Sequence, residues 1–201
     1  MKERRVLASK SLKCVAGGER EAIVPSPFLR KYGELLVRAA AGYPILDVAC
    51  GGGRNSVLLA SLGARVIGID IDLDRSRLDQ GRLTGASFEE VSHLITFVKH
   101  DLIREPWPFE AQSIGGVINI HFLHIPLLRL FSDCLIPGGC LLLETIGGHG
   151  ENFQELPKAG TLRSALRSEF SFLTYQERKS GPSGANAVSV KLFAIREHPN
   201  I

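Results

Sequence analysis

The fold of this chain is decided by residues 45–60, whose sequence is ILDVACGGGRNSVLLA. The apolar run at 45–48 is typical of a buried strand, and the run at 57–62 has the length and character of a helix. Between them lie Gly51, Gly52 and Gly53. Because glycine lacks a Cβ, the backbone here can turn sharply and approach a ligand, and the N–H groups at the helix start favour an anionic group. The stretch therefore predicts a ligand-binding loop.

A second apolar run, residues 64–69, ends at Asp70, seventeen residues after Gly53. A carboxylate at this spacing accepts hydrogen bonds from ribose hydroxyls in nucleotide-binding βαβ units. Three glycines after a strand also occur in strand-to-helix turns that bind no ligand. The position of Asp70 favours a ligand-binding loop over such a purely structural turn.

The composition is that of one folded α/β domain, since 44% of the 201 residues are hydrophobic and 22% are charged. The net charge is +3, and the first thirteen residues hold five basic side chains and one acidic one. We interpret residues 1–24 as a polar, basic leader that is solvated rather than bound to nucleic acid or lipid. Residues 25–201 are expected to form a single domain.

The cysteines, at positions 14, 50, 134 and 140, have no metal-ligand spacing with histidine, so no metal site is predicted. Reduced thiols fit a cytoplasmic protein. The first residues lack the apolar run of a secretory signal. The longest apolar stretch, residues 114–128, contains Asn119, His121 and His124 and is too short and polar to span a membrane.

Further elements are predicted along the chain from capping residues and periodicity. They are a helix after Ser26-Pro27, a helix capped by Asp74, strands at 95–98, 116–120 and 140–144, a loop at 104–109, a helix from Pro126 through Leu135 ended by Pro137-Gly138-Gly139, a short helix capped by Thr161, and a hairpin formed by 172–176 and 188–195.

Residues 25–196 together resemble the class I S-adenosylmethionine-dependent methyltransferases. The resemblance is carried by DVACGGG at 47–53, Asp70, Asp101-Leu102, Asn119, the Pro-Gly-Gly at 137–139 and the closing hairpin. It implies a Rossmann-like, doubly wound, seven-stranded, mostly parallel α/β sheet with a C-terminal antiparallel β-hairpin. More narrowly, Gly53-Arg54-Asn55 and NFQELP at 152–157 are similar to small bacterial methyltransferases of the tellurite-resistance branch. The sequence departs from the common pattern at Gly52 and at Gly115-Gly116.

The resemblance implies S-adenosyl-L-methionine as the cofactor. It places Asp47 near the ammonium group, Asp70 at the ribose hydroxyls, Asp101 at the adenine amino group and Asn119 near the sulfonium, because carboxylates and amide oxygens accept hydrogen bonds. The full set of expected cofactor-binding residues is Asp47, Ala49, Gly51, Gly53, Asp70, Ile71, Asp101, Leu102 and Asn119.

Two histidines are the catalytic candidates, because an imidazole titrates near neutral pH and can take a proton from the methyl acceptor. They are His121 and His124, and a structural role for either is the alternative. Arg54 and Asn55 are the candidate substrate-binding residues, although Arg54 can also be part of a surface ion pair. Glu144, at the end of the fifth strand, is a further candidate.

We therefore expect an enzyme, a monomer or homodimer, that transfers a methyl group to a small molecule carrying a thiol, a chalcogen oxyanion or a hydroxyl. A non-catalytic cofactor-binding sensor or partner subunit stays open. So does an NAD-dependent oxidoreductase, since Gly51-x-Gly53 and Asp70 fit a dinucleotide fingerprint, although Ser56 stands at the third glycine. Methylation of nucleic-acid bases is not favoured, because the fourth strand lacks a Pro-Pro-aromatic ending.

Overall fold

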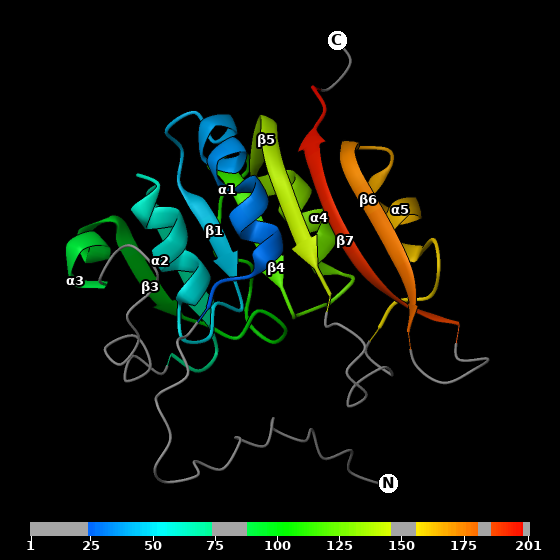
Figure 1. The fold of residues 1–201 in the computed structure, drawn as a ribbon, viewed down its shortest axis with the longest axis horizontal. Helices are drawn as coiled ribbons and strands as arrows, with labels where there is room; N and C mark the ends of the chain where they lie inside the picture. The colour runs from blue at the N-terminus through cyan, green and yellow to red at the C-terminus, as the bar shows by residue number, and fades with distance from the viewer. Residues whose placement is uncertain (1–23, 74–87, 146–155, 181–185, 199–201) are drawn as a thin grey trace, which may run out of the picture.

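The computed structural model describes residues 24–73, 88–145, 156–180 and 186–198. Its strands form one seven-stranded sheet in the order β3-β2-β1-β4-β5-β7-β6 (Figure 1). Only β7 runs antiparallel to its neighbours, β5 and β6. This confirms the predicted sheet and its closing hairpin. The strands are β1 Ile45–Val48, β2 Val66–Asp70, β3 Ile95–Lys99, β4 Ile114–Ile120, β5 Leu135–Glu144, β6 Phe170–Ser180 and β7 Ala187–Arg196.

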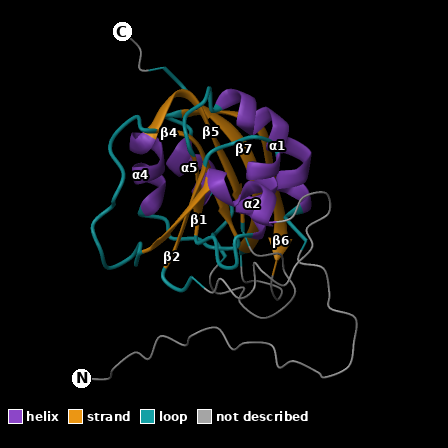
Figure 2. Ribbon diagram, turned by 90° about the vertical axis from the view of Figure 1, so that its left-hand side faces the viewer, coloured by secondary structure: helices purple, strands orange, loops and turns teal. Residues whose placement is uncertain are grey.

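The helices cover both faces of the sheet, so the molecule has three layers (Figure 2). On one face lie α1 Pro27–Ala39 and α2 Arg54–Ser61, and on the other lie α4 Leu127–Cys134 and α5 Thr161–Leu166. The short helices α3 Phe88–Val91 and η2 Ser92–Leu94 lead into β3. Each face buries its own apolar cluster, as expected for a sheet covered on both sides.

The helix predicted after Ser26-Pro27 is present as α1. Ser26 is its N-cap, and the Ser26 Oγ accepts hydrogen bonds from the backbone N–H groups of Phe28 at 3.1 Å and Leu29 at 3.3 Å. The prediction for α5 was wrong at its cap. Gly160, in the left-handed region with φ 77°, is the N-cap, and Thr161 is the first helical residue.

Two of the three glycines at which the sequence departs from the common pattern, Gly115 and Gly116, lie at the start of β4, beneath the end of α1. A Cβ on Gly115 would be 2.4 Å from the backbone oxygen of Ala40. A Cβ on Gly116 would meet ordinary contacts, the nearest at 3.4 Å from Leu36. Close packing of α1 on β4 therefore explains Gly115, but it does not require Gly116.

The sequence predicted that the helix α4 includes Leu135 and that the next strand starts at residue 140. Residues 140–144 do lie in β5, but both predicted boundaries were wrong. The helix ends at Cys134, and β5 already begins at Leu135, which pairs with Ile114. The register then shifts before the pair of Gly116 and Cys140. Pro137 has no N–H to donate and Gly138 has φ 80°, so these residues form an irregularity within the strand rather than a helix stop.

Some predictions fall outside the described residues: the basic leader apart from Val24, the helix capped by Asp74, and the motif at 152–157 apart from its last two residues. Cys50, Cys134 and Cys140 are buried free thiols. Among the described helices, none has the length and hydropathy needed to cross a bilayer.

Candidate cofactor and acceptor site

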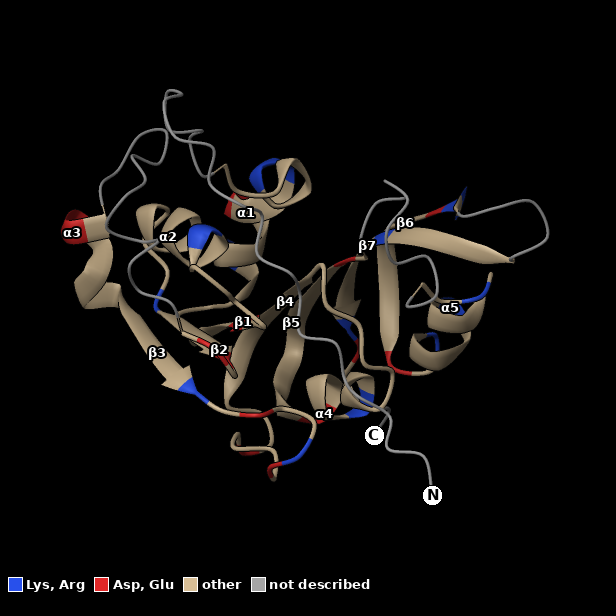
Figure 3. Cartoon of the chain, turned by 90° about the horizontal axis from the view of Figure 1, so that it is seen from below, with Lys and Arg blue, Asp and Glu red and all other residues tan. Residues whose placement is uncertain are grey.

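The candidate site lies where the sheet changes winding direction, between β1 and β4. Ligands of doubly wound sheets bind at this point, beyond the carboxyl ends of the strands. Figure 3 views this edge, with α1 and α2 on one side and α4 on the other. Two non-glycine residues just beyond the strands adopt left-handed backbone conformations: Ala49 after β1, with φ 55°, and His121 after β4, with φ 63°. Such conformations cost energy and concentrate at functional sites.

The glycine loop between β1 and α2 is closed by Asp70. Gly51 and Gly53 have φ values of 53° and 74°, so the sharp turn predicted from the sequence is present. The Asp70 Oδ2 accepts a hydrogen bond of 2.8 Å from the Gly51 N–H, and its Oδ1 accepts one of 2.9 Å from the Asp72 N–H. These bonds use two of the roughly four lone-pair positions of the carboxylate, which leaves capacity for hydroxyl donors.

Asp47 is the most strongly perturbed acidic side chain of the site. It is 1% exposed on the face of β1 that α2 covers, and the Ser56 Oγ donates a hydrogen bond of 2.6 Å to its Oδ2. Burial raises the pKa of Asp47 to about 7, and the bond from Ser56 opposes that rise. Within the described part of the chain, Asp47 Oδ1 has no hydrogen-bond partner. A buried acceptor of this kind fits a cationic donor such as an ammonium group.

Ser56 is a residue whose role the sequence reasoning missed. It was considered only as the substitute for a third glycine. The signal available in the sequence is a small hydroxyl residue in the first turn of the helix that follows a strand containing a carboxylate.

The residues expected at an adenine ring lie at the ends of β2 and β3. Ile71 is 57% exposed, and Leu102 is partly buried against the core. Asp101 Oδ1 accepts hydrogen bonds from the N–H groups of Ile103 at 2.9 Å and Arg104 at 3.1 Å. Asp101 therefore shapes the turn after β3, and its Oδ2 lies 3.8 Å from the exposed Arg104 Nε.

Asn119 is buried near the end of β4, and its Oδ1 also has no partner among the described residues. Asp47 pairs in register with Ile118, and Val48 pairs with Asn119. Because side chains alternate along a strand, Asn119 faces the side of the sheet opposite to Asp47. The two unpartnered acceptors therefore do not converge from one face, and the expected contact of Asn119 with the sulfonium stays a prediction.

The two candidate histidines lie in the connection from β4 to α4. The His121 backbone N–H donates to the Glu144 carbonyl at 2.7 Å, and part of its otherwise exposed side chain is shielded from water by neighbouring groups. Partial burial of the imidazole lowers the pKa of His121 from its ordinary value of 6.5, the nearby Glu144 opposes this shift, and the charges of Arg54 and Lys191 add to it. The His124 carbonyl accepts a hydrogen bond of 3.0 Å from the Leu127 N–H at the start of α4.

Arg54 and Asn55 open α2, directly after the glycine loop. Arg54 is partly buried, and no ion pair of its side chain occurs in the parts of the chain that the structure describes. Asn55 is 5% exposed, and its Oδ1 accepts a hydrogen bond of 3.1 Å from the Ser26 N–H. Asn55 therefore fastens the start of α1 to α2, while its predicted substrate contact stays untested.

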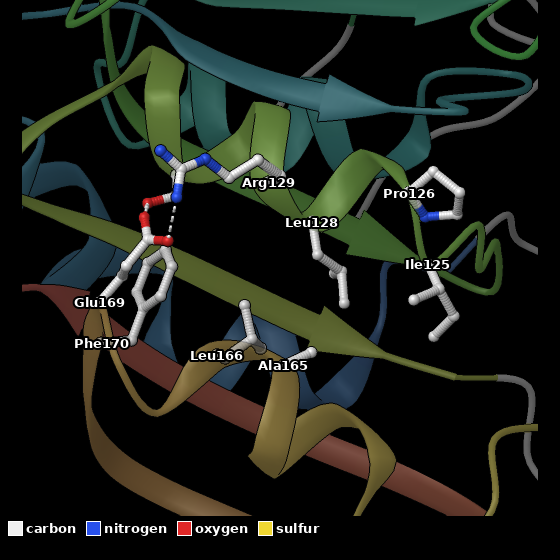
Figure 4. Close-up of a pocket in the computed structure, with 9 residues that line it drawn as sticks. Ile125, Pro126, Leu128, Arg129, Ala165, Leu166, Glu169 and Phe170 are labelled. Carbon is white, nitrogen blue, oxygen red and sulfur yellow. Dashed lines mark hydrogen bonds and ion pairs between the residues drawn. The ribbon is translucent and has the colours of Figure 1, made fainter.

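A pocket of about 170 Å³ lies on the other side of the sheet, between α4 and α5 (Figure 4). The Arg129 Nη1 donates to the Glu169 Oε1 at 2.7 Å, and the Ser132 Oγ donates to the Glu169 Oε2. These polar groups satisfy one another. No residue predicted for the cofactor or the acceptor lines this pocket, so it is separate from the candidate site.

One family model matches the part of the chain that holds the candidate site. Residues 45–139 match the family model described as a methyltransferase domain. The matched segment runs from β1 to the start of β5 and includes the predicted cofactor-binding residues. It therefore supports the resemblance to S-adenosylmethionine-dependent methyltransferases that the sequence predicts.

Among individual proteins, the chain is similar to the ubiquinone biosynthesis O-methyltransferase of Xanthomonas campestris pv. campestris (strain B100), with 30% identity over 112 residues. That alignment covers 54% of this chain and 45% of the relative. The chain thus spans about half the length of the curated relatives it matches.

Solved structures support the fold. The 1,6-didemethyltoxoflavin-N1-methyltransferase of Burkholderia thailandensis, solved with bound S-adenosylhomocysteine, has a TM-score of 0.55 at 16% identity and covers 86% of this chain and 79% of its own. A TehB-like SAM-dependent methyltransferase from Corynebacterium glutamicum has a TM-score of 0.53 at 20% identity and covers 83% of this chain and 88% of its own. At such identities the likeness concerns the fold, and the tellurite-resistance branch stays a prediction.

Proposed function

We propose that this chain is an enzyme that transfers a methyl group from S-adenosyl-L-methionine to the hydroxyl of a small molecule. The observation that carries the proposal is the buried Asp47 Oδ1, which has no partner among the described residues, beside a glycine loop that Asp70 closes. The methyltransferase-domain match over residues 45–139 supports the cofactor. The name of the O-methyltransferase relatives favours a hydroxyl over the thiol and chalcogen oxyanion that the sequence left open.

The residues present fit this cofactor. The Asp47 Oδ1 would accept from its ammonium group, and the free lone pairs of Asp70 would accept from its ribose hydroxyls. The exposed Ile71 and the partly buried Leu102 would contact the adenine ring. Backbone N–H groups of the glycine loop would face the carboxylate of its methionine part. When bound, the cofactor supplies a methyl group on a positively charged sulfur, and that sulfur is itself a good leaving group because it departs as a neutral thioether.

The protein then has to orient the acceptor and receive its proton. A ring nitrogen of His121 is the proposed proton acceptor, because a lowered pKa keeps the imidazole neutral at neutral pH. Arg54 is the residue proposed to attract negative charge on an acceptor, since its side chain has no ion pair in the described structure.

Calorimetry with the full chain tests the cofactor. S-adenosylhomocysteine is expected to bind, and NAD is expected to bind far more weakly. Tight NAD binding without binding of S-adenosylhomocysteine would favour an oxidoreductase instead.

An acceptor screen with S-adenosylmethionine then tests catalysis, using small phenols, thiols, selenite and tellurite. Turnover of phenols is expected. Cofactor binding without turnover of any acceptor would favour the sensor or partner-subunit alternative.

A further inference from the structure

Glu144 is a buried carboxylate close to His121, the proposed proton acceptor. It ends β5, is 5% exposed, and pairs in register with Ile120 on β4, one residue before His121. The His121 N–H donates to the Glu144 carbonyl at 2.7 Å. His121 and Glu144 therefore leave neighbouring strand ends, and their backbones are fixed relative to each other.

Two side chains hold the Glu144 carboxylate in place, and a third residue supports one of them. The Ser26 Oγ, at the start of α1, donates to its Oε2. The Lys191 Nζ lies 2.5 Å from its Oε1, and Lys191 stands directly opposite Glu144 where β7 pairs with β5. Asn55 in turn holds the Ser26 backbone, so the first turn of α2, which follows the glycine loop, is linked to Glu144 through Ser26.

This arrangement leaves part of the carboxylate free. An ionised carboxylate has about four lone-pair positions, and the described residues Ser26 and Lys191 use two of them. Lys191 compensates the buried charge, because an unpaired carboxylate at this depth would be strongly unfavourable. Among the described residues, no further donor reaches the two remaining lone-pair positions.

We propose that Glu144 binds the methyl acceptor and favours an acceptor whose hydroxyl donates a hydrogen bond over an oxyanion. This proposal rests on the proposed function. A hydroxyl can donate to the free lone pairs of Glu144. At this position a deprotonated oxygen has no proton to donate and is repelled by the carboxylate, whereas negative charge elsewhere on the acceptor can still be attracted by Arg54. Glu144 is thus a specificity-determining residue, and Ser26 and Lys191 are its positioning residues.

The test measures binding, so that it does not depend on turnover. The full chain is saturated with S-adenosylhomocysteine and titrated with catechol or with selenite. Glu144→Gln keeps the shape of the side chain but removes its charge, and Glu144→Asp keeps the charge but withdraws it from the site. The matched control is Glu110→Gln, an exposed glutamate before β4, at the opposite edge of the sheet.

We expect the wild-type chain and Glu110→Gln to bind catechol more tightly than selenite. Both Glu144 variants should bind catechol at least tenfold more weakly, with affinity for S-adenosylhomocysteine unchanged within about twofold. A carboxylate that only fastened α1 to the sheet would lower the melting temperature of the variants and leave catechol affinity unchanged, and that result would overturn the proposal.

Two further outcomes separate this proposal from the function on which it rests. A wild-type chain that binds S-adenosylhomocysteine but prefers selenite, or binds neither probe, overturns the role of Glu144 while the cofactor assignment stands. A wild-type chain that does not bind S-adenosylhomocysteine overturns both.

Discussion

The Asp70 Oδ2 accepts a 2.8 Å hydrogen bond from the Gly51 backbone N–H, so the carboxylate that ends β2 also holds the loop that follows β1. Shaping of the loop, which the structure shows, and the contact with a ribose, which the sequence predicts, therefore involve the same side chain. Loss of this carboxylate should both loosen the loop and remove a ligand contact.

Asp70→Ala is expected to weaken binding of S-adenosylhomocysteine by roughly 10- to 100-fold, because hydrogen bonds to a charged group contribute about 1.5–3 kcal/mol. Calorimetric titration measures the effect. The exposed neighbour Asp72 provides the control, since Asp72→Ala keeps the backbone N–H that donates to Asp70. Equal affinity of Asp70→Ala and the wild type would show that Asp70 does not contact the ligand.

Asp47 is expected to make cofactor binding depend on pH. Its pKa is raised from 3.8 to about 7 in the folded protein, chiefly by burial, and an ammonium group at Oδ1 would favour the ionised form. Affinity for S-adenosylhomocysteine should therefore rise between pH 5 and pH 8. Binding near pH 6 should release protons, which calorimetry in buffers of different ionisation enthalpy detects. Asp47→Asn should bind weakly at every pH and lose this dependence.

The same group predicts how the stability of the ligand-free protein changes with pH. Because the folded-state pKa of Asp47 lies above the unfolded-state value, the folded state binds more protons between pH 4 and pH 7. The contribution of Asp47 to the free energy of unfolding is therefore largest below pH 4 and falls as the pH rises through 7. Urea unfolding of the wild type and of Asp47→Asn across this pH range isolates the contribution of Asp47 to the free energy of unfolding. A parallel pH dependence in the two proteins would contradict it.

His121 is expected to act as the neutral proton acceptor. Its lowered pKa predicts that turnover falls on acidification only below its ordinary value of 6.5. Removing a general base typically costs about 10²- to 10⁴-fold in rate, so His121→Ala should lower kcat with little change in the affinity for S-adenosylhomocysteine. His124→Ala is the companion variant. If both variants keep wild-type turnover and substrate affinity, positioning of the acceptor suffices without a base.

Gly115 and Gly116 form a matched pair for the packing of α1 on β4. Gly115→Ala brings a Cβ to 2.4 Å from the Ala40 oxygen, so it should lower the free energy of unfolding by about 1–3 kcal/mol. Gly116→Ala, whose Cβ finds contacts of 3.4 Å or more, should change it much less. Chemical denaturation measures both variants. Similar losses in the two would show that α1 yields to the added methyl group.

The sequence by itself determined the architecture, because the relevant signals are local. The apolar run at 45–48, the glycines and Asp70 predict β1, the loop and β2, and the Ser26-Pro27 pair predicts the start of α1. All of these elements are present. Local signals failed where a distant strand decided the outcome: residues 135–139 follow a helix and contain Pro-Gly-Gly, yet pairing of Leu135 with Ile114 draws them into β5.

Only the tertiary structure decided which polar groups meet. Glu144 and Ser26 are 118 residues apart, and their hydrogen bond depends on α1 packing across the ends of strands that form much later in the chain. Asp47 and Asn119 lie on opposite sides of the sheet, and this too depends on the register between β1 and β4. Spacing along the sequence carries no record of register or of helix placement, and so it predicted the glycine loop and named Glu144 as a candidate, but not the contacts with Ser26 and Lys191 that hold its carboxylate.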